Sequence, residues 1–217
     1  GSQILTPDKE VHDWKRTQEE FRDRNPLSIS VEGKSLSYVS IPQQEQDAIA
    51  LFHGLIGVGV LRGFRFLGTS QSDRYDSVFF MNYTDADKVL FDTKTNRLGV
   101  NRSFSLPYLT EPKILEYKFA FSSLVADFEK ENKFSKHIDF VVCWSAGDRF
   151  KERFYLQPLL VGDEGSSRQI FGATHQVFSV GAQETPAFEL LILEDLIAWL
   201  QDPAGEEAHQ KTAYRDN

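Results

Sequence analysis

The chain has little cysteine and no long apolar run. Its 217 residues include one cysteine, Cys143, which excludes a disulfide framework and any zinc site built on cysteines. No apolar stretch approaches the ~20 residues that a membrane-spanning helix needs. The first 25 residues are dominated by charges, unlike a secretory signal peptide. These absences predict a cytoplasmic protein without a membrane partner.

Basic residues are also scarce relative to acidic ones. The chain has 24 Lys and Arg against 32 Asp and Glu, a net charge of -8. This balance argues against a dedicated nucleic-acid binder, whose binding domain is usually basic. It does not exclude an active site that binds metal ions through carboxylates, because a partner or a second domain can supply the basic surface. Hydrophobic residues, at 41%, suffice for a sizeable core and exclude global disorder.

The sequence divides into an arm, a body and a tail. Gly1 and Ser2 read as a tag scar. Residues 1–41 are expected to form an N-terminal arm or linker, with a helix over 7–24 and a hairpin over 27–41. Residues 42–202 are expected to form one α/β domain. The polar residues 203–217 are expected to form a frayed tail.

The central part of the body predicts the order helix, strand, strand, strand, helix, strand. The expected elements are a helix over 43–61, strands over 63–70, 72–82 and 112–120, a helix over 121–137 and a buried strand over 138–146. The strand–helix–strand step requires a parallel crossover. The fold class is therefore α/β, with a mixed central sheet and flanking helices. Beyond the centre we expect strands over 153–160 and 169–180 and a helix over 187–200.

Three charged residues lie in two of these predicted strands and form a candidate site. Asp76 lies at the start of one predicted strand, and Glu116 and Lys118 lie forty positions further on in another. Alternate residues of a strand point to the same face, so Glu116 and Lys118 share a face. Burying both charges is costly unless they pair or bind a metal. An exposed sheet face with an ordinary Glu–Lys pair is the alternative interpretation.

Asp76, the Glu116-Tyr117-Lys118 triplet and the order of elements over residues 42–146 resemble the PD-(D/E)XK nuclease superfamily. The family pattern has a proline before the first acid, where this chain has Tyr75. The distance between the two parts of the motif is longer than in compact members, which places an inserted hairpin at 83–111. The resemblance implies a restriction endonuclease-like core.

The resemblance also implies a magnesium- or manganese-dependent endonuclease. Asp76, Glu116 and Lys118 would be catalytic, and the metal ligands would be Asp76, Glu116 and the backbone carbonyl of Tyr117. Oxygen ligands suit these hard cations. Lys118 would orient the attacking water and neutralise charge in the transition state. Glu45, near the start of the leading helix, would have a supporting role.

The expected substrate is nucleic acid, DNA in preference to RNA. A basic strip on or after the crossover helix is the best local region for contact with the backbone: Lys130, Lys133 and Lys136. The chain is then expected to be the effector domain of a larger bacterial or archaeal defence or repair protein. It would act as a homodimer or with an ATPase or regulatory domain outside this chain. The alternative is a catalytically silent nuclease-like module for docking or oligomerisation.

Other polar residues have weaker functional signals. His53 and His175 are isolated in the sequence, and a lone histidine is usually structural. Three acids near residue 90 lack the glycine and the closing glutamate of a calcium loop, and we interpret them as a solvated turn: Asp85, Asp87 and Asp92. Cys143 lies within an apolar strand and is expected to be a core residue.

Overall fold

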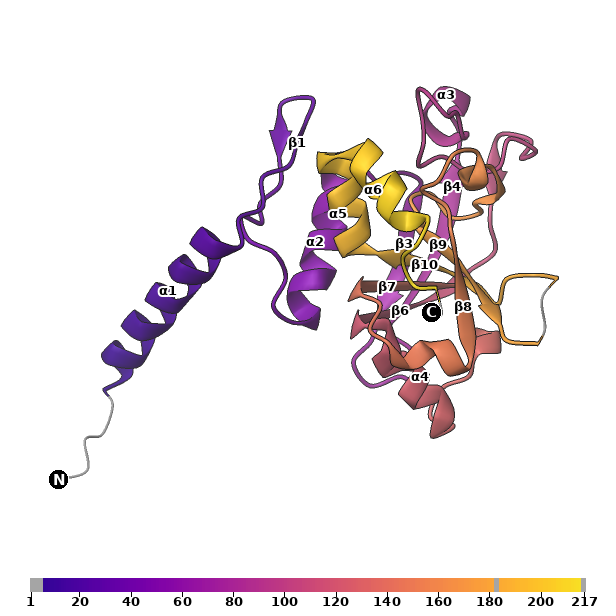
Figure 1. Cartoon of the computed structure of the whole chain (residues 1–217). Coiled ribbons are helices and arrows are strands. Elements are labelled where there is room, and N and C mark those ends of the chain that lie inside the picture. The colour runs from indigo at the N-terminus through magenta and orange to yellow at the C-terminus, as the bar shows by residue number, and fades with distance from the viewer. Residues whose placement is uncertain (1–5, 182–183, 216–217) are drawn as a thin grey trace.

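The computed structural model describes residues 6–181 and 184–215 and has a mixed sheet at its centre (Figure 1). The strand order is β3-β4-β6-β7-β10-β9-β8. In that order the bounds are Phe64–Thr69, Ser77–Tyr83, Lys113–Ala120, Phe140–Ser145, Phe188–Ile192, His175–Ser179 and Phe154–Pro158. The β6–β7 and β7–β10 pairs are parallel, and the other pairs on this path are antiparallel. The predicted α/β class with a mixed central sheet is confirmed.

The two faces of the sheet are covered by different helices. The helices α2 (Glu45–Gly57) and α5 (Leu193–Gln201) pack on one face, and α4 (Phe121–Glu129) packs on the other. Strand β7 has a side-chain period of two and so serves both faces. Phe140 and Val142 belong to the core under α2 and α5, whereas Val141 and Cys143 belong to the core under α4. Cys143 is buried, as predicted.

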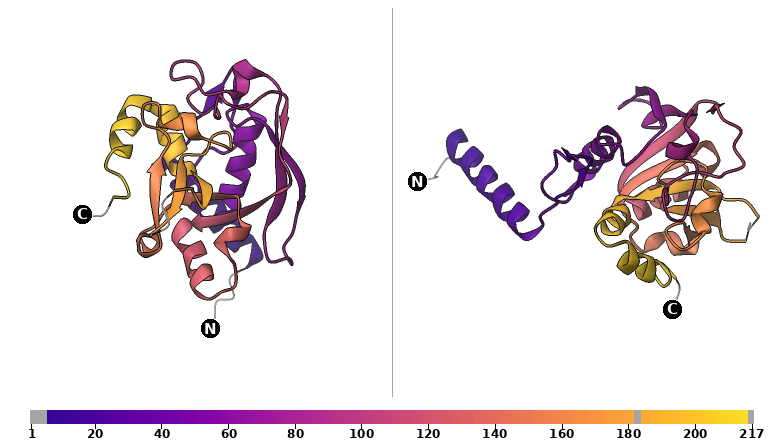
Figure 2. Two further views of the ribbon diagram at one scale, coloured as in Figure 1. Left: turned by 90° about the vertical axis from the view of Figure 1, so that its right-hand side faces the viewer. Right: turned by 90° about the horizontal axis from the view of Figure 1, so that it is seen from above.

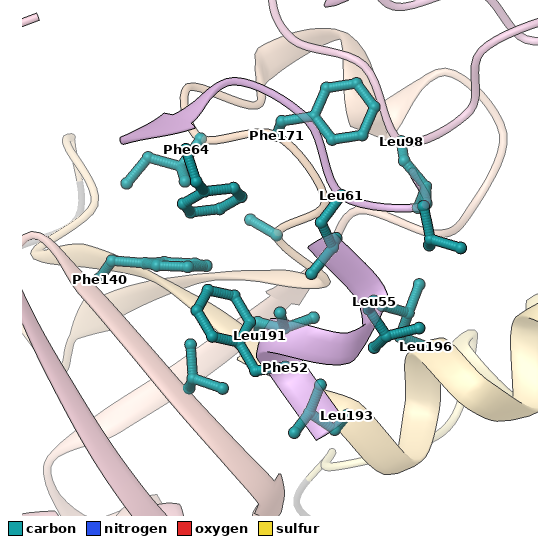
Figure 3. Close-up of a cluster of buried hydrophobic side chains, with 14 of the residues drawn as sticks. Phe52, Leu55, Leu61, Phe64, Leu98, Phe140, Phe171, Leu191, Leu193 and Leu196 are labelled. Atoms are coloured by element: carbon teal, nitrogen blue, oxygen red, sulfur yellow. The ribbon is translucent and has the colours of Figure 1, made fainter. Parts of the chain in front are cut away.

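The core under α2 joins residues that are far apart in the sequence. Phe52 and Leu55 of α2 lie close to Phe140 of β7, Leu191 of β10 and Leu196 of α5 (Figure 3). All five side chains are fully buried. Burial of a side chain of this size stabilises the fold by roughly 1.5–3 kcal/mol. This packing fixes the position of α2, and therefore of Glu45 at its first turn, relative to the central strands.

The central order of elements agrees with the sequence-based expectation. Helix α2 is followed by β3, β4 and β6, then by α4 and β7. The bounds differ: α2 ends at Gly57 and α4 at Glu129, each earlier than expected. The insertion before β6 contains a short helix α3 (Ala86–Val89) and β5 (Tyr108–Leu109), which pairs with β4. Short 3-10 turns, η1 to η3, lie at Ser135–His137, Arg149–Glu152 and Glu164–Ser167.

The C-terminal part corrects two predictions. The helix expected over 187–200 is instead strand β10 followed by α5, and β10 lies between β7 and β9 inside the sheet. The tail expected to be frayed contains α6 (Pro203–Gln210), which starts with Asp202 as N-cap and Pro203 in its first turn. Glu206 and Gln210 of α6 are buried. Residues 203–210 therefore belong to the folded body.

The N-terminal arm has two parts with different environments. Helix α1 (Pro7–Arg24) extends away from the body, and none of its residues is buried (Figures 1 and 2). The predicted hairpin is present as β1 (Ser30–Val31) and β2 (Lys34–Ser35). Around it, Leu27, Ile29 and Leu36 are buried in the core under α2. The hairpin is therefore anchored to the body, whereas α1 projects from it.

No helix in residues 6–181 and 184–215 combines the length and the apolar character needed to cross a membrane.

Candidate functional site

Asp76 and Glu116 lie against each other at the end of the β4–β6 pair. The backbone N–H of Asp76 donates to Glu116 Oε1 at 2.8 Å. The backbone N–H of Tyr117 donates to Asp76 Oδ2 at 2.9 Å. These bonds form because the register places Ser77 opposite Leu115, so Asp76 lies just beyond the paired residues and beside Glu116. The two acids that the sequence placed forty residues apart form one cluster.

Glu116 is buried and needs a counter-charge. Its side chain has an exposed fraction of 0%, and it forms an ion pair with Lys133. Burial raises the pKa of the Glu116 carboxyl, the bond from Lys133 opposes that shift, and the negative charge of Asp76 adds to it. Lys133 comes from the segment between α4 and η1 and is mostly buried itself. The pKa of Glu116 is raised overall, and the bond from Lys133 is the main influence against that shift.

Lys118 forms an ion pair with an acid that the sequence did not connect to the site. It shares a face of β6 with Glu116, as predicted, but its ammonium group pairs with Asp127 of α4 at 2.9 Å. Burial lowers the pKa of Lys118, but the bond to Asp127 and the charges of Asp127, Glu45 and Glu116 outweigh it and raise the pKa overall. Lys118 is therefore held as a cation beside the acids.

Glu45 completes the group from the opposite side. Burial raises the pKa of its carboxyl, and the negative charge of Asp76 raises it further. Glu45 and Asp76 both line an open cavity of ≈ 570 Å³, which we call the inner cavity. His53 and Tyr117 also line it, with His53 Nε2 and the Tyr117 hydroxyl 3.1 Å apart. Asp76 is therefore accessible from the inner cavity.

The donor set fits a hard divalent cation in its chemistry. Such an ion is bound by one or two carboxylates and keeps several waters, and Asp76 and Glu116 supply two adjacent carboxylates. The ammonium of Lys133 already provides a cation at Glu116, which indicates that this position favours positive charge. In residues 6–181 and 184–215, no three or more His, Cys, Asp or Glu side chains are arranged to hold a metal. The carboxylate pair is thus the whole side-chain donor set, and Lys133 would have to move.

The sequence brought out the acids of this cluster but not the position of one lysine, Lys133. Lys130 and Lys136 are exposed, whereas Lys133 is the ion-pair partner of Glu116 rather than part of a solvated strip. His53 lies in the inner cavity, although the sequence showed it only as an isolated histidine. The spacing from Glu45 to His53, two helical turns, was the available signal that both share a face of α2.

The remaining polar residues have structural partners. His175 is buried on β9, which is separated from β6 by β7 and β10. Its ring contacts Thr174 and Gln210, as expected for a structural histidine. Asp85 caps α3, and Asp92 accepts bonds from the backbone of its own turn. These two acids match the predicted solvated turn.

Comparisons with known proteins find no relative. No family model matches the chain, and no curated protein or solved structure matches it either. The functional argument therefore depends on the geometry of the cluster.

Proposed function

We propose that this protein is a metal-dependent phosphodiesterase, a nuclease that hydrolyses DNA. The observation that carries the proposal is the contact between Asp76 and Glu116 on neighbouring strands, with Lys133 and Lys118 on the same cluster. Two carboxylates suit a divalent ion that assists phosphoryl transfer, and adjacent cations can offset charge on the phosphate. The inner cavity leaves Asp76 accessible to a substrate.

The arrangement of the central elements supports the same proposal. A helix, three antiparallel strands, a second helix and a parallel fourth strand are the parts of a restriction endonuclease-like core. In this chain these parts are α2, β3, β4, β6, α4 and β7, in the strand order β3-β4-β6-β7. We take this core, with Asp76 and Glu116 between its second and third strands, as the finer description of the fold.

Each side chain of the cluster would have a separate role in hydrolysis. Asp76 and Glu116 would hold Mg²⁺ or Mn²⁺, together with the backbone carbonyl of Tyr117. A bound ion would lower the pKa of a water and stabilise charge on the scissile phosphate. Lys118 would orient the attacking water and offset negative charge on the phosphate. Glu45, whose carboxyl pKa is raised, would accept or relay a proton at the mouth of the inner cavity.

The test is cleavage of supercoiled plasmid in Mg²⁺ or Mn²⁺. We expect wild type to nick or linearise the plasmid, and Asp76→Asn and Glu116→Gln to lose at least about a hundredfold in rate, the scale of a removed catalytic group. Glu111→Gln changes an exposed glutamate just before β6 and is the matched control. A single-stranded RNA and a single-stranded DNA of the same length, incubated separately with wild type, test the preference for DNA. Activity that survives both cluster substitutions would rule out this site.

The cellular setting follows from the proposed activity. An acidic nuclease of this size would act as the effector domain of a larger bacterial or archaeal defence or repair protein in the cytoplasm. A homodimer or a fused ATPase or regulatory domain would supply the control and the basic surface. We expect the chain alone to cleave plasmid at a basal rate, and a partner or regulatory domain that does not raise this rate would contradict the proposed control.

A second function is favoured by helix α1. Its side chains are all at least partly exposed, and Trp14 has an exposed fraction of 66%. A catalytically silent module would use α1 for docking or oligomerisation, with the cluster serving only the fold. Light scattering on the chain and on a variant lacking residues 1–24 separates the two functions. A dimer that dissociates on this deletion, with no cleavage by either protein, would favour docking.

A further inference from the structure

An aromatic cluster adjoins Asp76 and Lys133, two of the charged residues of the proposed site. Tyr75 precedes Asp76, and Phe134 follows Lys133. The Tyr75 hydroxyl lies 2.7 Å from His137 Nδ1. The same hydroxyl accepts a hydrogen bond of 3.2 Å from the backbone N–H of Phe134. The ring of His137 makes edge contacts with both Tyr75 and Phe134. The rings of this aromatic cluster (Tyr75, Phe134 and His137) are therefore held in fixed positions beside the carboxylates.

Phe134 is exposed although it belongs to a fixed cluster. Its exposed fraction is 39%, and the ammonium of Lys136 lies 6.0 Å from the centre of its ring. Lys130 is exposed on the same segment of the chain. Arg74, which is exposed in the β3–β4 loop, contacts this segment by donating to the carbonyl of Asn132 at 2.6 Å. An exposed ring with one cation over its face and two more on neighbouring segments fits a ligand that is both planar and anionic.

A second cavity borders Asp76 on the side of Tyr75. It has a volume of ≈ 580 Å³, and we call it the outer cavity. Arg74, Tyr75 and Asp76 line it together with apolar side chains from β3, β4 and β6: Leu67, Val78 and Ile114. Asp76 also lines the inner cavity. A chain molecule with its reacting bond at Asp76 could thus continue into a cavity on each side.

We propose that the aromatic cluster and the outer cavity bind unpaired bases of a single nucleic-acid strand that crosses Asp76. Proteins that bind single strands combine cations along the backbone with aromatic rings on which bases stack. Here Arg74, Lys130 and Lys136 supply the cations, and Phe134 supplies the exposed ring. A base stacked within a duplex could not enter the outer cavity without unpairing. This inference rests on the proposed function and specifies its substrate as an unpaired strand.

Binding without cleavage tests the inference. A fluorescein-labelled DNA strand of about 12 nucleotides, within the range of known single-strand sites, is titrated with wild-type protein in EDTA, and anisotropy is read. We expect Phe134→Ala to weaken binding about tenfold, the loss of one base–aromatic stack. Tyr155→Ala is the matched control, because Tyr155 has an exposed fraction of 38% and lies on β8 at the far end of the sheet. We expect this control to bind as wild type does.

Two further ligands separate stacking from simple charge attraction. A duplex of the same sequence should bind less tightly than the single strand. An abasic strand of the same length should bind to wild type at least as weakly as the normal strand binds to Phe134→Ala. Equal binding of normal and abasic strands, equal losses for Phe134→Ala and Tyr155→Ala, or no binding to wild type would each overturn the inference.

The outcome is distinguishable from that of the cleavage experiment. EDTA removes divalent ions, so binding is measured independently of hydrolysis. If Phe134→Ala weakens single-strand binding but wild type cleaves no plasmid, this base-binding site stands and the proposed nuclease activity is rejected. If wild type cleaves plasmid but Phe134→Ala binds the single strand as tightly as wild type, the proposed nuclease activity stands and this base-binding site is rejected.

Discussion

The amide of Asp76 donates a hydrogen bond of 2.8 Å to the carboxylate of Glu116, and the carboxylate of Asp76 accepts one of 2.9 Å from the next amide, that of Tyr117. Each acid is thus tied to the strand that carries the other. Because the bonds use the backbone, the two carboxylates keep their separation whatever the rotamers of their neighbours. A preorganised pair of this kind is what a metal site needs from its protein.

Added Mn²⁺ should raise the thermal stability of wild type. An ion that binds only the folded state stabilises it by about 2.7 kcal/mol when its free concentration is a hundred times its dissociation constant. Asp76→Asn should lose most of this gain, because the amide can still accept the bond from Tyr117 but carries no charge for the ion. Differential scanning calorimetry at neutral pH with and without Mn²⁺ measures the gain.

Glu111→Gln is the control for this experiment, since it removes an exposed carboxylate just before β6. It should keep the full gain from Mn²⁺. Equal gains in wild type and Asp76→Asn would show that the cluster is not the site of the ion.

Removing Lys133 should destabilise the protein through Glu116. The side chain of Glu116 is completely buried, so Lys133→Met leaves its charge without a partner. Loss of one member of a buried pair costs about 3 kcal/mol. Urea denaturation at pH 7 measures the change. The double variant Lys133→Met/Glu116→Gln should recover much of it, because no uncompensated charge remains.

Lys130→Met provides the comparison, because Lys130 is exposed next to the end of α4. Its effect should be small, as for most surface substitutions. If the double variant is as unstable as the sum of its single variants, Lys133 does not act through Glu116.

The central elements and the acids could be predicted from the sequence because local patterns determine them. The apolar run of β7 and the alternation along β6 gave the strands, and the spacing of Asp76 and Glu116 followed from them. The partner of Glu116 had no such signal. Lys133 lies seventeen positions after Glu116 in a charged stretch that reads as solvated. Only the return of the chain after α4 brings it to the carboxylate.

The error at residues 187–200 has a physical cause. Apart from the buried Glu189, the strand β10 is apolar, and it continues directly into the apolar stripe of α5. A fully buried strand has no alternation, so its pattern cannot be distinguished from that of a buried helix. The missed helix α6 did carry a signal, Asp202 followed by Pro203, which matches a helix start. Its polar composition concealed that signal.

Arg168 should be essential for joining the insertion before β6 to the segment that precedes β9. Its guanidinium group is fully buried and donates to backbone carbonyls of Arg97, Gly99, Leu159 and Ala173. Arg168→Met should lower the free energy of unfolding by at least about 3 kcal/mol, because several buried acceptors lose their donor. Arg168→Lys should recover little, since one ammonium cannot reproduce the planar fork.

Chemical denaturation of both variants tests this expectation, with Arg102→Lys as a control at an exposed arginine of the insertion. Full stability of Arg168→Lys would mean that charge alone, and not the geometry of the fork, holds these segments together.

Asp195 should make stability depend on pH between about 4 and 6. Burial raises the pKa of its carboxyl to about 6, against bonds from Gln210 and Tyr214 that lower it. The neighbouring His175 does not compensate this charge, because burial lowers the pKa of its ring to about 3 and keeps it neutral. As pH rises through this window, the unfolded chain releases the Asp195 proton first. The folded state is therefore progressively disfavoured by this group, by at most about 3 kcal/mol.

Asp195→Asn isolates this contribution from those of the other acids. The free energy of unfolding, measured by urea denaturation from pH 4 to pH 7, should fall more steeply with pH in wild type than in Asp195→Asn. Asp163→Asn, at an exposed position in the turn before η3, controls for the loss of an aspartate as such and should follow wild type. The expected difference appears between pH 4 and 6 and is constant above that window, because Asp195 is then ionised in both states. Parallel curves for wild type and Asp195→Asn would mean that the carboxyl of Asp195 titrates alike in the folded and unfolded chains, and that the bonds from Gln210 and Tyr214 fully offset its burial.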